Sequence, residues 1–321
     1  MKLQTQIPLE KQSSKLIDYD SKLLLLGSCF VENIGTKLEY FKFQNFQNPF
    51  GILFHPKAIE TLIRNAIRGK KYHDEDVFYH NELWHSFDAH SKLSKPSKEE
   101  LIKTLNNNLD LTSKQLHNAS HVIITFGTAW LYAHSKSNLP VANCHKVPQK
   151  EFVKQLLSVQ EIVNAMTLIV NMIREVNTKA TFIFTVSPVR HLKDGFIENT
   201  QSKAHLITAI HQFLNHQSPI ENPRSFYFPS YELMMDELRD YRFYDEDMLH
   251  PNKTAVNYIW EKFKYVWISE ESQEVMNEVE TIENGKAHRP FNPSSDAHQQ
   301  FLQQLEIKEA KLRAKYPHIT F

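Results

Sequence analysis

The stretch of sequence that decides the fold is Leu23-Leu24-Leu25-Leu26-Gly27-Ser28-Cys29-Phe30. A short continuous apolar run that ends at a glycine is typical of a strand buried on both faces of a parallel sheet. Residues 31–41 carry apolar side chains at helical spacing, so we expect a helix directly after the turn. A nucleophile in such a turn gains the free N–H groups and the dipole of a helix N-terminus. We therefore predict an α/β enzyme whose nucleophile, Ser28 or Cys29, lies at this turn.

Strands and helices are expected to alternate along the rest of the chain. Two further apolar runs, His121–Phe126 and Thr181–Val186, predict buried strands. Amphipathic stretches predict helices over residues 57–68, 97–109, 153–175, 203–214 and 254–266, and a short strand is expected at 225–228. This alternation is typical of a doubly wound α/β sheet, whose site lies at the carboxyl ends of the strands.

The last part of the chain differs in composition from the rest. Residues 270–321 are rich in Glu, Gln, Lys and Asn, and a helix is expected over 297–315. We predict a main domain over residues 1–268 and a helical appendage over 269–321. The appendage is expected either to pack across the domain or to serve in self-association as a homo-oligomer.

Charge and composition narrow the classes of partner. Lys+Arg and Asp+Glu both number 37, so net charge draws the chain neither to nucleic acid nor to a membrane. The first eight residues lack the apolar core of a secretory signal, and no apolar run approaches the length of a membrane span, so we expect a cytoplasmic protein. The two cysteines, Cys29 and Cys144, are not expected to form a structural disulfide.

A second chemical motif stands near the end of the predicted domain. Asp247 and His250 are three residues apart and are followed by a proline and a helical stretch. A carboxylate at this spacing in a loop can orient the imidazole, and His250 could then act as general base toward the nucleophile. The alternative is a surface Asp-His pair, and the position at the end of an α/β domain favours the catalytic interpretation.

With both motifs in view, the chain resembles the GSCFA family, which is related to the SGNH (GDSL-like) hydrolases. Here the motif reads Gly27-Ser28-Cys29-Phe30-Val31, and the similarity spans most of residues 20–265. The resemblance implies a three-layer αβα sandwich with a parallel, flavodoxin-like sheet and a C-terminal helical extension. In SGNH enzymes a Gly-Asp-Ser turn supplies the nucleophile and a later Asp-x-x-His supplies its partners. This register nominates Cys29, and Ser28 is the alternative if the turn is shifted by one residue.

The resemblance also implies an oxyanion hole with a glycine and an asparagine from two later blocks. Gly51 resembles the glycine. The later Gly-x-Asn block begins at Gly127 but has Ala129 where the asparagine is expected. Asn143 can replace that donor, and His145 can add another or shape the pocket. For Asn143, a loop residue that closes a turn is an equally frequent outcome of this spacing.

Two loop clusters are expected to build pocket walls, one over residues 84–91 and one over 187–191. His85, Asp88 and His90 have the composition of a metal site, but no further ligand completes the set at tight spacing, so we expect no metal. Arg190 is predicted to pair with a substrate carboxylate or with acidic residues of the 232–247 region.

The function class that follows is an SGNH-like hydrolase or acyltransferase acting on an acyl ester of a small molecule or glycan, without a cofactor. The alternative from another class is a non-catalytic domain of the same fold that binds a glycan or acyl group, which the missing asparagine favours. A metal-dependent hydrolase that uses the loop histidines is a third, weaker reading.

Overall fold

The fold is built on one parallel sheet in a computed structural model that describes residues 5–216 and 224–321. The sheet comprises β1 (Lys22–Gly27), β2 (Gln44–Gln47), β5 (His121–Phe126), β9 (Thr181–Val186) and β10 (Ser225–Tyr227). Their order is β10-β9-β5-β1-β2, and every neighbouring pair is parallel. The first strand thus lies between the second and the third, as in flavodoxin-like sheets. The predicted α/β class is confirmed.

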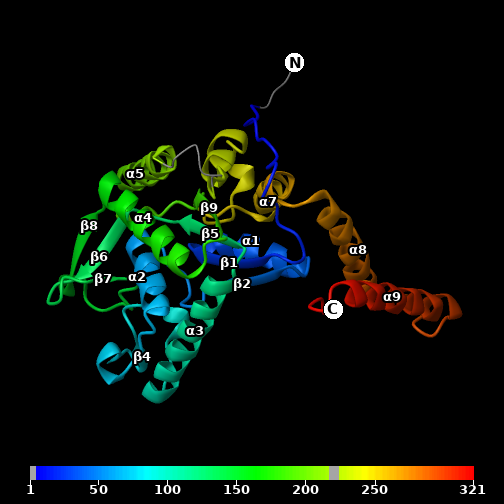
Figure 1. Cartoon of the computed structure of the whole chain (residues 1–321), viewed down its shortest axis with the longest axis horizontal. Coiled ribbons are helices and arrows are strands. Elements are labelled where there is room, and N and C mark those ends of the chain that lie inside the picture. The colour runs from blue at the N-terminus through cyan, green and yellow to red at the C-terminus, as the bar shows by residue number, and fades with distance from the viewer. Residues whose placement is uncertain (1–4, 217–223) are drawn as a thin grey trace.

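Helices cover both faces of this sheet (Figure 1). One face packs against α2 (Pro56–Ile67), α3 (Lys98–Asn118), α4 (Val159–Val176) and α5 (Phe196–Asn215). The other face packs against α1 (Cys29–Tyr40) and α7 (Lys253–Trp267). The result is a three-layer αβα sandwich.

The leucine run of β1 is buried because both of its faces are covered. Leu24 and Leu26 pack in the cluster formed with α2 to α5, whereas Leu23 and Leu25 pack in the cluster formed with α1 and α7. Successive side chains of a strand point to opposite faces, so a strand between two helical layers needs apolar residues at every position. This is the physical reason for the unbroken leucine run.

Gly27 ends β1 in a conformation and a space that only glycine fits. Its φ is +134°, and a Cβ built there would lie 2.1 Å from the Thr125 carbonyl oxygen of β5. We expect Gly27→Ala to lower the free energy of unfolding by about 3 kcal/mol, because strain and a backbone clash add together. Gly69→Ala is the matched control: φ there is also positive, at +63°, but a Cβ meets nothing within 4 Å. Urea unfolding of both variants tests this, and equal losses would contradict the clash.

The structure corrects the prediction of one long helix over residues 153–175. Residues Phe152–Leu156 form β8, which pairs with β6 (Trp130–His134), and β6 also pairs with β7 (Pro140–Val141) in a small antiparallel sheet. The helix α4 begins only at Val159, because Ser158 and Glu161 form a capping box. The short sheet and the hairpin of β3 (Phe78–His80) and β4 (Leu83–His85) were not predicted.

The bounds of two other helices also differ from the prediction. Helix α5 starts seven residues before the predicted position 203, and α3 extends nine residues beyond 109. The chain after β10 forms α6 (Ser230–Glu232) and a π-helical turn over Leu233–Glu237. Within the described ranges, no helix is both long and apolar enough to cross a membrane. Residues 1–4, which belong to the segment in which a signal sequence was sought, lie outside the described residues.

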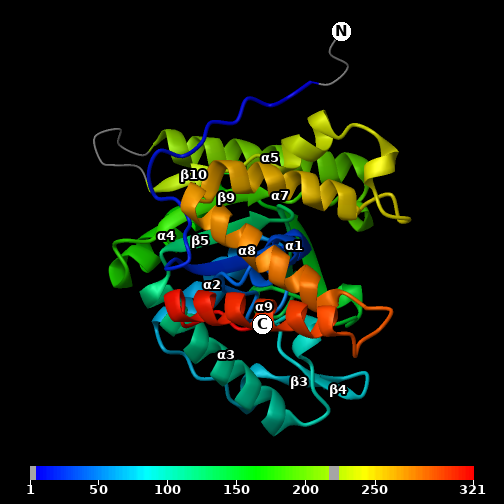
Figure 2. The ribbon, with the colours of Figure 1, turned by 90° about the vertical axis from the view of Figure 1, so that its right-hand side faces the viewer.

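The C-terminal region is helical, as predicted, and its second helix projects from one end of the sandwich (Figures 1 and 2). It consists of α8 (Glu270–Ala287), which was not predicted, and α9 (Asp296–Lys315). Helix α8 packs against the α1 and α7 layer through Val275, Met276, Val279 and Ile282. The end of the chain returns to the segment before β1, where the ring of Tyr316 lies tilted against that of Tyr19 with their centroids 5.0 Å apart. The division at residue 268 stays a prediction.

Candidate active site

The turn after β1 carries Ser28 and Cys29 at the carboxyl edge of the sheet. Ser28 is the N-cap residue of α1, and Cys29 is the first residue of that helix. The Ser28 side chain is fully buried, and its Oγ has no hydrogen-bond partner among the described residues. Cys29 is partly exposed and is not in a disulfide. Of the two candidate nucleophiles, therefore, only Cys29 is open to a substrate in this conformation.

The surroundings of Cys29 act on its ionisation in opposing directions. Burial raises the pKa of the Cys29 thiol, and the Glu32 carboxylate one turn along α1 raises it further. The Lys203 side chain and the backbone N–H groups of Cys29 and Phe30 act to lower that pKa. Those N–H groups belong to the first turn of α1, where helix N–H groups lack intrahelical partners and can hold an anion.

Three elements meet beside the turn. A Cβ built on Gly127, which follows β5, would lie 3.2 Å from Ser28 Cβ and 3.1 Å from Nε2 of His191, which follows β9. His191 Nε2 is buried without a hydrogen-bond partner in the part of the chain that the structure describes. Burial lowers the pKa of His191 to about 3, and the charges of Lys203 and His250 act in the same direction. His191 is therefore a neutral ring against the turn at neutral pH.

Lys203 is buried beneath this junction and is 1% exposed. Its Nζ donates to the carbonyl oxygens of Gly127 and Ser187, both at 2.7 Å, so it joins the carboxyl ends of β5 and β9. No carboxylate pairs with it within residues 5–216 and 224–321. Burial lowers the pKa of Lys203 to about 7, the nearby Cys29 acts to raise it, and Arg190 acts to lower it.

A pocket of about 730 Å³ opens next to the junction. His191 and Phe54 line it, and the Phe54 carbonyl oxygen is a third neighbour of the Gly127 position beside Ser28. Its volume suits a small-molecule ligand. The pocket is also lined by Thr128, Trp130, Tyr132, Asn143, Cys144, His145 and Asp194.

The structure places both residues of the predicted Asn143 and His145 pair in this pocket. Asn143 Oδ1 accepts the backbone N–H of His145 at 2.8 Å, the turn-closing contact that its spacing also allowed. His145 Nε2 donates to the Ser86 carbonyl at 2.8 Å, and burial lowers the pKa of His145 to about 4. Both residues form the pocket wall, and neither donates a hydrogen bond to the turn.

The two glycines nominated for the oxyanion hole have their N–H groups engaged. Gly51 N donates to the Asn48 carbonyl at 2.8 Å, and Gly127 N donates to the Phe54 carbonyl at 2.8 Å. At the missing asparagine position, the Ala129 N–H donates to Ser202 Oγ at 2.7 Å. Because these three backbone N–H groups are already engaged, the N–H groups of Cys29 and Phe30 in the first turn of α1 are better placed to bind an oxyanion.

Asp247 and His250 form a hydrogen-bonded pair. His250 Nδ1 donates to Asp247 Oδ2 at 2.5 Å, and Asp247 Oδ1 accepts the backbone N–H groups of His250 at 2.9 Å and Leu249 at 2.8 Å. These backbone donors, with the ring, lower the pKa of Asp247 to about 2. Because Nδ1 donates to the carboxylate, the neutral ring carries its lone pair on Nε2.

The position of this pair relative to the turn is more open than expected. The side chain of His250 is 47% exposed, and it forms no hydrogen bond with Ser28 or Cys29 within the described chain. It is near enough to His191 for its charge to lower the pKa of that ring. His250 thus lies at the rim of the site, and its role as general base stays a prediction.

Arg190 lies on the loop after β9. Its Nη2 contacts Met235 Sδ at 3.6 Å. Among the described residues it forms no ion pair with a carboxylate, neither in the 232–247 region nor elsewhere. Pairing with an acid of the protein is thus absent from the structure, and pairing with a substrate carboxylate stays a prediction.

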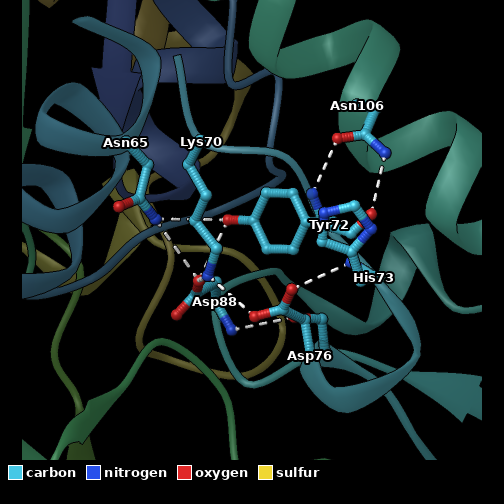
Figure 3. A network of polar contacts seen from close by, with 8 residues as sticks. Asn65, Lys70, Tyr72, His73, Asp76, Asp88 and Asn106 are labelled. Atoms are coloured by element: carbon cyan, nitrogen blue, oxygen red, sulfur yellow. Dashed lines mark hydrogen bonds and ion pairs between the residues drawn. The ribbon is translucent and has the colours of Figure 1, made fainter. Parts of the chain in front are cut away.

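His85 and Asp88, which were considered as metal ligands, form contacts with other protein groups. Asp88 Oδ2 accepts from Tyr72 Oη at 2.9 Å and lies 3.5 Å from Lys70 Nζ, in the network that fastens the loop after α2 (Figure 3). His85 bonds Ser94 Oγ at 2.6 Å and the His80 carbonyl at 2.9 Å. No group of three potential metal ligands occurs in the described residues.

Sequence reasoning missed two residues at this junction, Lys203 and the ring of His191 as a neighbour of Ser28. Lys203 carried a detectable signal, because it shares a helical face with the buried residues Asn199, Leu206 and Ile210 of α5. A lysine in that register is either buried or breaks the pattern.

Comparison with known proteins identifies the family. The model of the GSCFA family matches residues 22–263, which include the turn and the Asp247-His250 pair. The chain belongs to the GSCFA family. The model of the C-terminal domain of GSCFA domain proteins matches residues 279–321, which cover the second half of α8 and all of α9.

Other relatives of this GSCFA protein are remote. No curated protein matches it. A crystal structure of a carbohydrate esterase family 3 from Talaromyces cellulolyticus is similar with a TM-score of 0.37 and 10% identity, over 81% of this chain and 99% of that one. A likeness of this size does not bear on activity, so the function must be argued from the site itself.

Proposed function

We propose that this GSCFA protein is a hydrolase or acyltransferase of the SGNH type, acting on an acyl ester such as that of a carbohydrate. The observation that carries the proposal is the position of Cys29. It is the accessible nucleophile at a helix N-terminus and at the carboxyl edge of strand β1, and it follows Ser28, which like the pocket residue His191 lies next to Gly127. Active-site nucleophiles of open α/β sheets occupy this position.

The proposed reaction has two steps. The Cys29 thiolate attacks the ester carbonyl, the oxyanion is held by the N–H groups of Cys29 and Phe30, and the alcohol leaves with a proton from the His250 imidazolium. The thioester is then attacked by water or by an acceptor hydroxyl, from which His250 takes the proton, and the thiolate is restored. Both steps balance without a cofactor.

The pocket suits a polar substrate with a flat face. Trp130 and Tyr132 present aromatic surface to it, and Asn143 and Asp194 add amide and carboxylate groups that can bind hydroxyls. Lys154 Nζ, which lies 4.3 Å from the centroid of the Trp130 ring, pairs with Asp194 at 2.7 Å and holds this wall in place. A sugar ring carries hydroxyls around an apolar face, so the wall supports a carbohydrate ester.

A second candidate function is binding of a glycan or acyl group without turnover. It is favoured by the exposure of His250, which has no hydrogen bond to Cys29 in the described structure, and by Ala129 at the asparagine position. The binding function requires the same pocket but not the thiol.

Turnover of aryl acetate and of peracetylated monosaccharides by the purified full chain tests the proposal. We expect release of acetate that stops when Cys29 is alkylated with iodoacetamide. Alkylation of a Cys144→Ala variant shows that Cys29 is the thiol responsible. Absence of turnover on every ester, together with sugar binding that survives alkylation, would favour the binding function instead.

A further inference from the structure

Lys203 is costly for the fold, and its two hydrogen bonds do not require a charge. A buried ammonium without a carboxylate loses its hydration and gains only dipolar partners, so burial strongly disfavours it. The two carbonyls of Gly127 and Ser187 that Nζ binds could be satisfied by neutral donors. Buried titratable groups of this kind concentrate at functional sites, where the charge has a use.

The position of Nζ shows where that charge acts. Lys203 reaches from α5 to the carbonyl of Gly127. Gly127 lies next to Ser28, because a Cβ built on the glycine would be 3.2 Å from Ser28 Cβ. Cys29 follows Ser28 in the chain. The charge of Lys203 acts to lower the pKa of the Cys29 thiol, and Cys29 acts to raise the pKa of Lys203. No hydrogen bond joins the two side chains in the described residues, so the influence is electrostatic.

We propose that Lys203 is a positioning residue of the reaction centre, whose ammonium charge, held beneath the turn by two carbonyls, stabilises the anion that forms at Cys29. On ionisation the Cys29 sulfur loses its proton to solvent or to His250, and the negative charge of the thiolate acts to raise the pKa of Lys203, which favours the protonated amine. The same charge then favours the oxyanion of the first step. The inference rests on the proposed function in taking Cys29 as the reacting group.

The other charges around the pair are few and can be separated by experiment. Glu32 of α1 faces Cys29 and opposes its ionisation, but Lys92 pairs with Glu32 at 2.9 Å and weakens that opposition. Arg190 and His191 from the loop after β9 face Lys203, and Tyr231 of α6 presents its ring 5.8 Å from Nζ. Lys203 is the buried cation of this set, and buried charges are screened least by solvent.

The test is the pH dependence of Cys29 alkylation by iodoacetamide in a Cys144→Ala background. Only the thiolate reacts, so the midpoint of the rate profile reports ionisation. We expect Lys203→Met to raise the midpoint by up to about one pH unit, which slows alkylation by up to about tenfold below pH 7, where the amine of the parent protein is protonated. Lys203→Arg keeps the charge and should leave the midpoint within about 0.3 units of the parent. Lys57→Met, which removes a lysine paired with Glu60 on α2, controls for net charge.

Two results would overturn the inference. One is a folded Lys203→Met protein with the parent midpoint, and the other is an equal rise in Lys203→Met and Lys203→Arg. If Lys203→Met does not fold, the reciprocal effect decides: Cys29→Ala should lower the titration midpoint of the Lys203 side chain, followed by NMR of its Cε and assigned by its loss in Lys203→Arg. An unchanged Lys203 titration would equally refute the coupling. A wild-type protein that turns over no ester but shows the shift would refute the proposed function and the positioning role of Lys203, and only the electrostatic coupling of Lys203 with Cys29 would stand.

Discussion

Replacing Cys29 with alanine is expected to lower kcat/KM for ester turnover at least about a thousandfold, because the group that forms the acyl intermediate is removed. Cys29 is the accessible residue of the turn, whereas the Oγ of Ser28 is buried without a partner. Ser28→Ala should retain turnover within about tenfold, since the hydroxyl has no hydrogen-bond partner among the described residues. Steady-state kinetics of both variants, with thermal unfolding as the fold control, measures this.

The opposite pattern has a definite meaning. If Ser28→Ala is inactive and Cys29→Ala retains full activity, the turn must rearrange to expose Ser28, and the nucleophile has been placed one residue too late. Cys29→Ser is an informative third variant. A hydroxyl at the same position is a weaker nucleophile without a stronger base, so we expect low activity that exceeds that of Cys29→Ala.

The second large effect is expected at the Asp247 and His250 pair. His250→Ala should reduce kcat about 100- to 1,000-fold with little change in KM, because a general base acts on proton transfer and not on binding. Asp247→Asn should cost less, about tenfold to 100-fold, because an amide can still receive Nδ1–H but no longer stabilises the imidazolium. Activity measured over pH for both variants separates lost proton transfer from lost binding.

The matched control is His117→Ala, since His117 is exposed on α3 and its Nδ1 bonds only the Ser113 carbonyl of its own helix. It should behave as wild type. Full activity of His250→Ala would remove the pair from the mechanism and leave His191, the other imidazole at the turn, as the base to examine. Loss of activity with unchanged ligand affinity would contradict the binding function.

The sequence predicted the central strands well because their burial leaves a simple pattern. Strands β5 and β9 have the predicted bounds, since strands covered on both faces must be apolar throughout. By contrast, β2 has the sequence Gln44-Asn45-Phe46-Gln47 and is half-buried at the edge of the sheet, so it contains no apolar run that would predict a strand. Residues of strand β8 were predicted as part of a helix because Val153 and Leu156 also fit helical spacing.

In the candidate site, the turn at Gly27 and the Asp247-His250 pair could be predicted from the sequence, but the buried contacts of His191 and Lys203 could not. The Gly27 turn and the Asp247-x-x-His250 spacing are local, and local patterns can be read from a chain. The approach of Ser28 and His191 to Gly127 and the two carbonyls bound by Lys203 depend on the order of β1, β5 and β9 in space. Distances across strands have no signature along the sequence, so the buried charge beneath the turn emerged only from the structure.

The central claim is that Cys29 carries the acyl group, and the most direct test is to locate that group. The full-length protein is mixed with an activated acetate ester, quenched in acid within the first turnover, digested, and analysed by peptide mass spectrometry, with an iodoacetamide-blocked sample as control. We expect one acetyl group per chain, as a thioester on Cys29 that hydroxylamine removes. An acetyl group on Ser28, or none on the peptide containing the turn while ester is being consumed, would contradict it.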